Sequence, residues 1–150
     1  MRITIGSDHA GFELKEEVKS HLAGRGDDVV DVGTNGLASV DYPDFARQVG
    51  ETVARGEVEF GVLVCGSGLG MEIAANKVPG VRAVQVMDAE MAKMSRLHND
   101  ANVVTLAGRY LEPEQAGEIV DTFLSTAFEG GRHQLRIDKI TALERTGIAE

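Results

Sequence analysis

The sequence predicts a three-layer α/β/α fold around a five-stranded parallel sheet, a Rossmann-like arrangement. Short runs rich in β-branched residues alternate with longer stretches whose apolar residues recur about every 3.6 positions, the period of a helix. Strands that alternate strictly with helices form parallel sheets covered on both faces. A chain of 150 residues is long enough for one buried core and too short for two ordinary domains. We therefore expect a single domain over residues 1–150.

The strand pattern occurs five times along the chain. The segments are RITIG (2–6), DVVDVG (28–33), FGVLVCG (60–66), RAVQVM (82–87) and NVVTLAG (102–108). Each ends at or near Gly, Met or Asp and gives way to a stretch of mixed polarity with helical spacing, such as Leu14, Val18 and Leu22. The expected helices cover 10–24, 43–55, 69–76, 88–97, 112–127 and 133–146. No strand follows the last helix, so we expect it to pack as a terminal helix or to reach a neighbouring subunit.

Composition argues against several functional classes. The net charge is -9, from 15 Lys and Arg against 24 Asp and Glu, which disfavours a nucleic-acid or anionic-membrane surface. No segment has the apolar length of a membrane span, and a strand-like run begins at position 2, so we expect a cytoplasmic protein without a targeting segment. The single cysteine, Cys65, can form neither an internal disulfide nor a dithiol pair, and it lacks the CxxC spacing of a zinc site.

Three loops follow strands and should lie at the carboxyl edge of the sheet, where parallel sheets bind ligands. They are GSDHAG (6–11), CGSGLG (65–70) and GRYLE (108–112). The second loop lacks the Lys and Ser/Thr of a Walker A loop and the spacing of a dinucleotide fingerprint. It also has Met71 where cysteine phosphatases have arginine. We interpret it as an anion cradle of backbone N–H groups whose dipoles would stabilise a Cys65 thiolate, although a cysteine that ends an apolar strand is also a common core residue.

Two pairs of polar residues are further candidates. Asp8 and His9 follow the first strand at the ligand edge, although Asp8 could simply cap the next helix. His98 and Asn99 lie between a helix and the fifth strand, where they could also be ordinary turn residues. The residues alone leave both interpretations open.

Arginines gather in two places in this acidic chain. Arg132 and Arg136 are one helical turn apart, and Arg109 follows the fifth strand. Such a stripe is a solvated face in many proteins. At a net charge of -9, a local group of guanidinium ions favours a small bound anion, and phosphate suits the paired N–H donors of arginine.

Five motifs in the same order resemble the type B ribose-5-phosphate isomerases, within the family of ribose and galactose phosphate isomerases. They are GSDHAGFELK, DYPDFA, CGSGLGMEIAANK, RLHNDANVV and EGGRHQLRIDKI. The resemblance extends from residue 3 to about 145. It implies an enzyme of carbohydrate metabolism, in the pentose phosphate pathway, that interconverts D-ribose 5-phosphate and D-ribulose 5-phosphate through an enediolate, without a metal or an organic cofactor. It also implies a homodimer or homotetramer whose active sites are shared between subunits.

The resemblance implies roles for individual residues as well. Cys65 would be the general base that moves a proton between C1 and C2. The groups around the enediolate would be Gly66, Ser67, Gly68 and Gly70, with the Ser67 hydroxyl taking part in catalysis. Asp8 and His98 would help to open the furanose ring. The residues that would line the sugar or hold its phosphate are His9, Tyr42, Asn99, Arg109, Arg132 and Arg136, some of them from a partner chain.

The sequence departs from the family pattern at two positions, and two other functions are alternatives to the one that the resemblance implies. Ser67 stands where threonine is common in the family, and Met71 stands where one branch has glutamate, so the cysteine branch is the match. The chain could instead isomerise another phosphosugar, such as allose 6-phosphate or a tetrose phosphate, because pocket shape sets sugar length. A non-catalytic sugar-phosphate binding module is the other alternative, and the joint presence of Cys65, Ser67 and His98 disfavours it.

Overall fold

The computed structural model describes residues 1–146, so the last four residues of the expected domain lie outside the described residues. The strands are β1 (Arg2–Ser7), β2 (Asp28–Asp31), β3 (Phe60–Cys65), β4 (Ala83–Gln85) and β5 (Val103–Ala107). The helices are α1 (Phe12–Gly24), α2 (Tyr42–Ala54), α3 (Leu69–Ala75), α4 (Ala89–Asn99), α5 (Pro113–Ser125) and α6 (Arg132–Thr146). Every predicted strand and helix is present, and the ends differ from the prediction by about two residues, the usual uncertainty of helix and strand ends.

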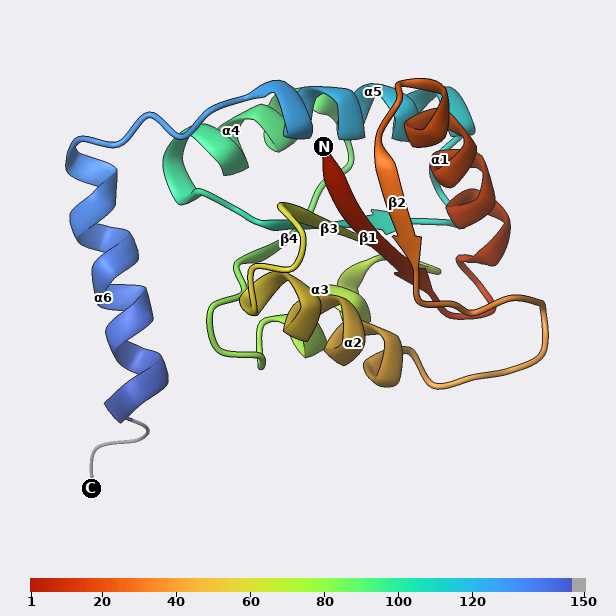
Figure 1. Cartoon of the computed structure of the whole chain (residues 1–150), viewed down its shortest axis with the longest axis horizontal. Helices are drawn as coiled ribbons and strands as arrows, with labels where there is room; N and C mark the ends of the chain where they lie inside the picture. Colours follow the sequence, from red (N-terminus) through yellow and green to blue (C-terminus); the bar gives the residue numbers. More distant parts are fainter. Residues whose placement is uncertain (147–150) are drawn as a thin grey trace.

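The strands form one parallel sheet in the order β2-β1-β3-β5-β4. Its central register pairs Ile5 with Val62 and Val62 with Val104. Figure 1 shows α1, α4 and α5 on one face of the sheet and α2 and α3 on the other, which confirms the three predicted layers. The chain runs outward from β1 to β2 and then returns to the other side of β1 with β3. The strand order therefore reverses between β1 and β3, where sheets of this kind open a crevice for ligands.

Alternation along the strands divides the core between the two faces of the sheet. Val62 and Val64 pack with Phe123 on the α1 and α5 side, whereas Leu63 and Cys65 pack with Val49 on the α2 and α3 side. Phe123 and Val49 are fully buried, and burying a side chain of this size stabilises the fold by about 1.5–3 kcal/mol. Cys65 therefore ends β3 with its side chain on the face covered by α3, the helix that begins four residues later.

The predicted terminal helix, α6, lies apart from the three layers (Figure 1). It contacts the body through the buried side chains of His133 and Ile137 and through Glu144, whose carboxylate accepts the Gly80 N–H at 2.9 Å. Leu135 and Leu143 on the same helix are 63% and 69% exposed. Apolar side chains that gather on one exposed helix usually mark a surface that another chain covers. Within the described part of the chain, no helix combines the length and apolar character needed to cross a bilayer.

Candidate active site

The loops after β1, β3 and β5 meet at the carboxyl edge of the sheet, as the sequence predicts, and surround a hollow of about 340 Å³. Its walls are Asp8, His9, Ala10, Tyr42, Cys65, Gly66, Ser67, Gly70, Arg109 and Tyr110. A hollow of this size suits a small metabolite. A larger groove of about 530 Å³ separates α6 from the body, and its walls include Val81, Ile140 and Leu143. The smaller pocket is the one that brings together the thiol of Cys65 and the polar side chains of the three loops.

The loop of residues 65–70 holds the cysteine sulfur at its mouth. Cys65 is 5% exposed, and its Sγ accepts the backbone N–H of Gly68 at 3.2 Å. The Ser67 hydroxyl accepts the N–H of Leu69 at 3.3 Å. Gly68 has a φ of +79°, a left-handed conformation that glycine adopts without strain and that turns the chain from β3 into α3. The turn thus brings a thiol, a hydroxyl and backbone N–H groups together beside the pocket.

Two side chains from neighbouring strands fix the shape of this loop. The buried hydroxyl of Thr105, in β5, donates to the Gly68 carbonyl at 2.8 Å. The Gln85 side-chain amide, in β4, donates to the Ser67 carbonyl at 3.0 Å. Sequence analysis did not identify either residue, because nothing in a strand pattern shows which side chain reaches a loop in another part of the chain.

Tyr42 and Arg109 lie directly against the loop. A Cβ atom on Gly70 would stand 2.7 Å from the Tyr42 ring, so only glycine lets the ring lie where it does. The Arg109 guanidinium lies over Gly66, and the Arg109 N–H donates to the Gly66 carbonyl at 3.0 Å. One wall of the pocket therefore carries an aromatic ring and another a fixed positive charge.

Asp8 and His9 also line the pocket. The Asp8 carboxylate is 6% exposed and accepts the Gly11 N–H at 3.0 Å, so it shapes the turn into α1 as well as lining the pocket. Nδ1 of His9 accepts the Val40 N–H at 3.2 Å. A backbone N–H can only donate, so in the neutral ring the proton is on Nε2, which is then a donor suited to an anionic group.

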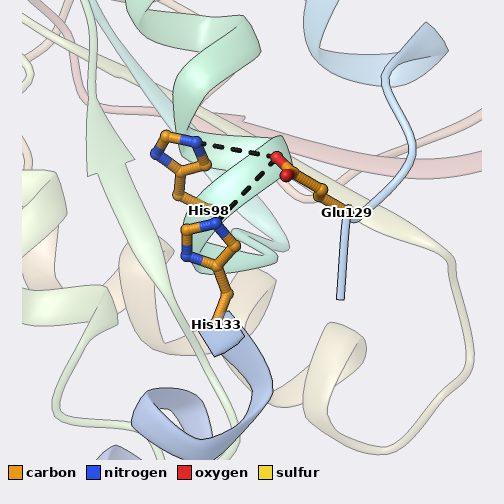
Figure 2. A group of neighbouring side chains, drawn as sticks. All are labelled: His98, Glu129 and His133. Carbon is orange, nitrogen blue, oxygen red and sulfur yellow. Dashed lines mark ion pairs between the residues drawn. The ribbon is translucent and has the colours of Figure 1, made fainter. Parts of the chain in front are cut away.

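Five predicted site residues do not line this pocket within the described chain. Gly68 lies in the loop behind it, where its N–H donates to Cys65 Sγ, and the other four are His98, Asn99, Arg132 and Arg136. His98, near the end of α4, lies beside Glu129 and stacks on His133, at the start of α6 (Figure 2). Arg132 and Arg136 are exposed on α6, where Arg136 donates to the Arg132 carbonyl at 3.2 Å. Asn99 lies in the groove between α6 and the body. The predicted site residues thus form two groups on one chain.

The chain matches the family described as Ribose/Galactose Isomerase over residues 3–140. Ribose-5-phosphate isomerase B of Escherichia coli K12 is 48% identical over 144 residues, which cover 96% of this chain and 97% of the relative. The crystal structure of a ribose 5-phosphate isomerase from Thermotoga maritima has a TM-score of 0.93 at 52% identity, covering 94% of this chain and 97% of that one.

A third relative was solved with a ligand. Ribose-5-phosphate isomerase B from Mycoplasma genitalium, with bound ribulose-5-phosphate, has a TM-score of 0.92 at 44% identity and covers 97% of both chains. The similarity therefore extends over nearly the whole length of each protein, including the loops at the carboxyl edge of the sheet.

Proposed function

Since the chain belongs to the ribose/galactose isomerase family, we infer that it is an aldose–ketose isomerase that interconverts D-ribose 5-phosphate and D-ribulose 5-phosphate. The observation that carries this inference is one pocket that holds a thiol, a glycine loop and an arginine together. This substrate pair belongs to the pentose phosphate pathway, and we expect the chain to act there, in the cytoplasm.

The reaction requires a base beside a weakly acidic C–H bond and donors for the enediolate oxygen that forms. We assign the base to Cys65, whose sulfur lies at the pocket wall and carries the proton between C1 and C2. We assign the donors to the Ser67 hydroxyl and to backbone N–H groups of the loop 66–70 other than those of Gly68 and Leu69, which already donate to Cys65 and Ser67. A donor placed in this way typically lowers the barrier by about 3 kcal/mol.

Phosphate binding at the far end of the sugar positions the reacting carbons. His9 and Arg109 are the donors that this chain's own pocket offers to the phosphate. The phosphate does not react, so its binding energy serves to hold C1 and C2 against the base. Arg132 and Arg136 carry charge suited to the same anion, but both are exposed on α6, outside this pocket.

We propose that a second copy of the chain supplies the missing half of each site. In a homodimer, or a tetramer built from such dimers, α6 and the end of α4 would bring His98, Arg132 and Arg136 to the pocket of the partner. The exposed Leu135 and Leu143 support this arrangement, because a dimer interface would bury them. Two-fold symmetry would then produce two identical sites per dimer.

Cyclic ribose 5-phosphate must open before it can enolise. We propose that the Asp8 carboxylate takes the proton from the C1 hydroxyl while the C1–O4 bond breaks. The electron pair of that bond goes to O4, and the imidazolium of His98 from the partner gives O4 its proton. Histidine suits this step because its side chain gains and loses a proton near neutral pH.

A conversion assay tests the proposed function and its alternative together. Purified protein is given ribose 5-phosphate or allose 6-phosphate, with Cys65→Ala as the control that keeps the fold. We expect rapid formation of ribulose 5-phosphate, little turnover of the hexose phosphate and none in the variant. Preference for allose 6-phosphate would point to the other phosphosugar reaction, and binding without turnover of either sugar would contradict an isomerase.

A further inference from the structure

His98 belongs to a cluster of three side chains, and the other two have no part in the proposed reaction. The cluster consists of His98, Glu129 and His133 (Figure 2). One oxygen of the Glu129 carboxylate lies 3.7 Å from Nε2 of His98 and 3.9 Å from Nε2 of His133. The two imidazole rings stack with centroids 4.3 Å apart and planes inclined by 16°. His98 is thus held between an aromatic ring on one face and a negative charge at one edge.

The backbone fixes Glu129 in this place. Its N–H donates to the carbonyl of Leu97 at 3.1 Å, which ties the segment between α5 and α6 to the last turn of α4. Leu97 directly precedes His98 in the chain. This bond keeps the backbone of Glu129 next to His98, within reach of its carboxylate, whose side chain is 49% exposed.

His133 differs from His98 in its surroundings. Its side chain is 9% exposed, whereas the His98 side chain is 34% exposed. Burial, followed by the positive charges of Arg132 and His98, lowers the pKa of the His133 imidazole, so this ring stays neutral near pH 7. A neutral His133 therefore places no second positive charge against the stacked face of His98.

The orientation of the rings argues against a shared metal ion, which two imidazoles and a carboxylate could otherwise bind. The lone pair of an imidazole nitrogen lies in the plane of its ring. Rings that stack 4.3 Å apart and nearly parallel direct these lone pairs side by side, not toward a common point. The arrangement instead suits a ring that must keep one orientation while it exchanges a proton.

We propose that Glu129 and His133 are positioning residues for His98: the carboxylate stabilises its protonated form, and the stacked ring fixes the plane in which it delivers a proton. This inference rests on the proposed function, because the proton it concerns is the one that His98 gives to O4 during ring opening. Neither residue touches the reacting carbons, so the enolisation that follows should not depend on them.

Two assays separate ring opening from enolisation. Conversion of ribose 5-phosphate requires both steps, because this sugar is mostly cyclic. Ribulose 5-phosphate cannot close into a furanose, since its C5 hydroxyl carries the phosphate, so exchange of its C1 proton with D₂O requires enolisation alone. The first rate is followed by product formation and the second by proton NMR.

Glu129→Gln removes the charge and keeps the shape. We expect kcat/KM for ribose 5-phosphate to fall at least about ten-fold, because a general acid contributes about 10²–10⁴ and part of that is lost. C1 exchange should change by less than about two-fold. Glu129→Asp, which restores the charge at a shorter reach, should recover part of the loss. Glu118→Gln removes the same charge from the exposed side of α5 and should alter neither rate.

Variants that keep or remove the aromatic ring of His133 test its stacking on His98. His133→Phe keeps a flat partner for His98 and should retain most of the conversion rate, whereas His133→Ala should lower conversion and leave C1 exchange intact. Thermal unfolding of each variant shows whether the fold is kept.

Several outcomes would overturn the inference. One is a rate of ribose 5-phosphate conversion in Glu129→Gln equal to that of the unchanged protein. Another is a fall of conversion and C1 exchange by the same factor in that variant. One Zn²⁺ bound per chain in calorimetry, and lost in Glu129→Gln, would assign the cluster to a metal instead. If the unchanged protein showed no C1 exchange, the proposed function itself would fail, which is a distinct result.

Discussion

A heterodimer of two defective chains tests whether the active site is shared. One chain carries Cys65→Ala and a first affinity tag, and the other carries Arg136→Ala and a second tag, so that purification over both tags isolates the mixed dimer. Cys65 lies in the pocket, whereas Arg136 lies exposed on α6 and belongs to the other group of predicted residues. In a shared site, the pocket of the Arg136→Ala chain therefore receives the intact α6 of its partner.

The expected activity follows from this arrangement. Loss of a charge-assisted hydrogen bond to phosphate costs about 1.5–3 kcal/mol, so the Arg136→Ala parent should lose about ten- to hundred-fold in kcat/KM, mostly through KM. The Cys65→Ala parent should lose about 10²–10⁴ in rate. The mixed dimer has one intact site and one doubly defective site, so we expect about half of the unchanged activity per dimer.

Steady-state conversion of ribose 5-phosphate, at a concentration near the KM of the unchanged protein, measures this activity. In the matched control, one chain of the mixed dimer carries both changes and its partner carries neither. Each shared site then has one defect, so we expect almost no activity. Activity equal to the mean of the two parents would refute a shared site. Failure to recover any mixed dimer over the two tags would refute it as well.

Three further predictions concern the loop and the sheet edge. Gly70→Ala places a methyl group about 2.7 Å from the Tyr42 ring, which is 39% exposed and can move aside; because the ring then leaves its place at the pocket wall, we expect a rise in KM by steady-state kinetics with little change in thermal midpoint. Burial alone would raise the pKa of Asp31, but hydrogen bonds from Lys15 and Lys19 leave that pKa lowered. The stability linked to Asp31 is therefore complete above about pH 4 and is lost as the pH falls through the folded-state pKa, which an acid titration by circular dichroism should show. Asp31→Asn removes the nearer carboxylate partner of the buried Lys15 and leaves only Glu16, at 3.1 Å; it should cost about 3 kcal/mol in urea unfolding, and a loss below about 1 kcal/mol would contradict this.

The sequence could predict the elements and the ligand edge because these depend on local patterns. Strands such as 60–66 are apolar runs bounded by glycine, and the parallel order follows from their alternation with helices. The loop after β3 could be identified for the same reason: Gly68 turns the chain by a left-handed conformation that glycine favours. Cys65 is then placed at the pocket by its position alone, as the last residue of β3.

The assembly of the site could not be predicted in the same way. Helical spacing shows which face of residues 133–146 is apolar, but not that Leu135 and Leu143 would stay uncovered by their own chain. The sequence motif that contains Glu129 indicates no role for it, because its contact with His98 depends on how the segment after α5 returns to α4. His133 was missed for a related reason: stacking of two rings 35 residues apart is a property of packing, which has no periodic signal.

Exchange of the C1 proton of ribulose 5-phosphate with D₂O is the most direct test of Cys65 as the base. We predict that Cys65→Ala slows this exchange at least about 100-fold while inorganic phosphate still binds, as measured by calorimetry. Exchange in Cys65→Ala within about three-fold of the unchanged protein would mean that another group moves the proton.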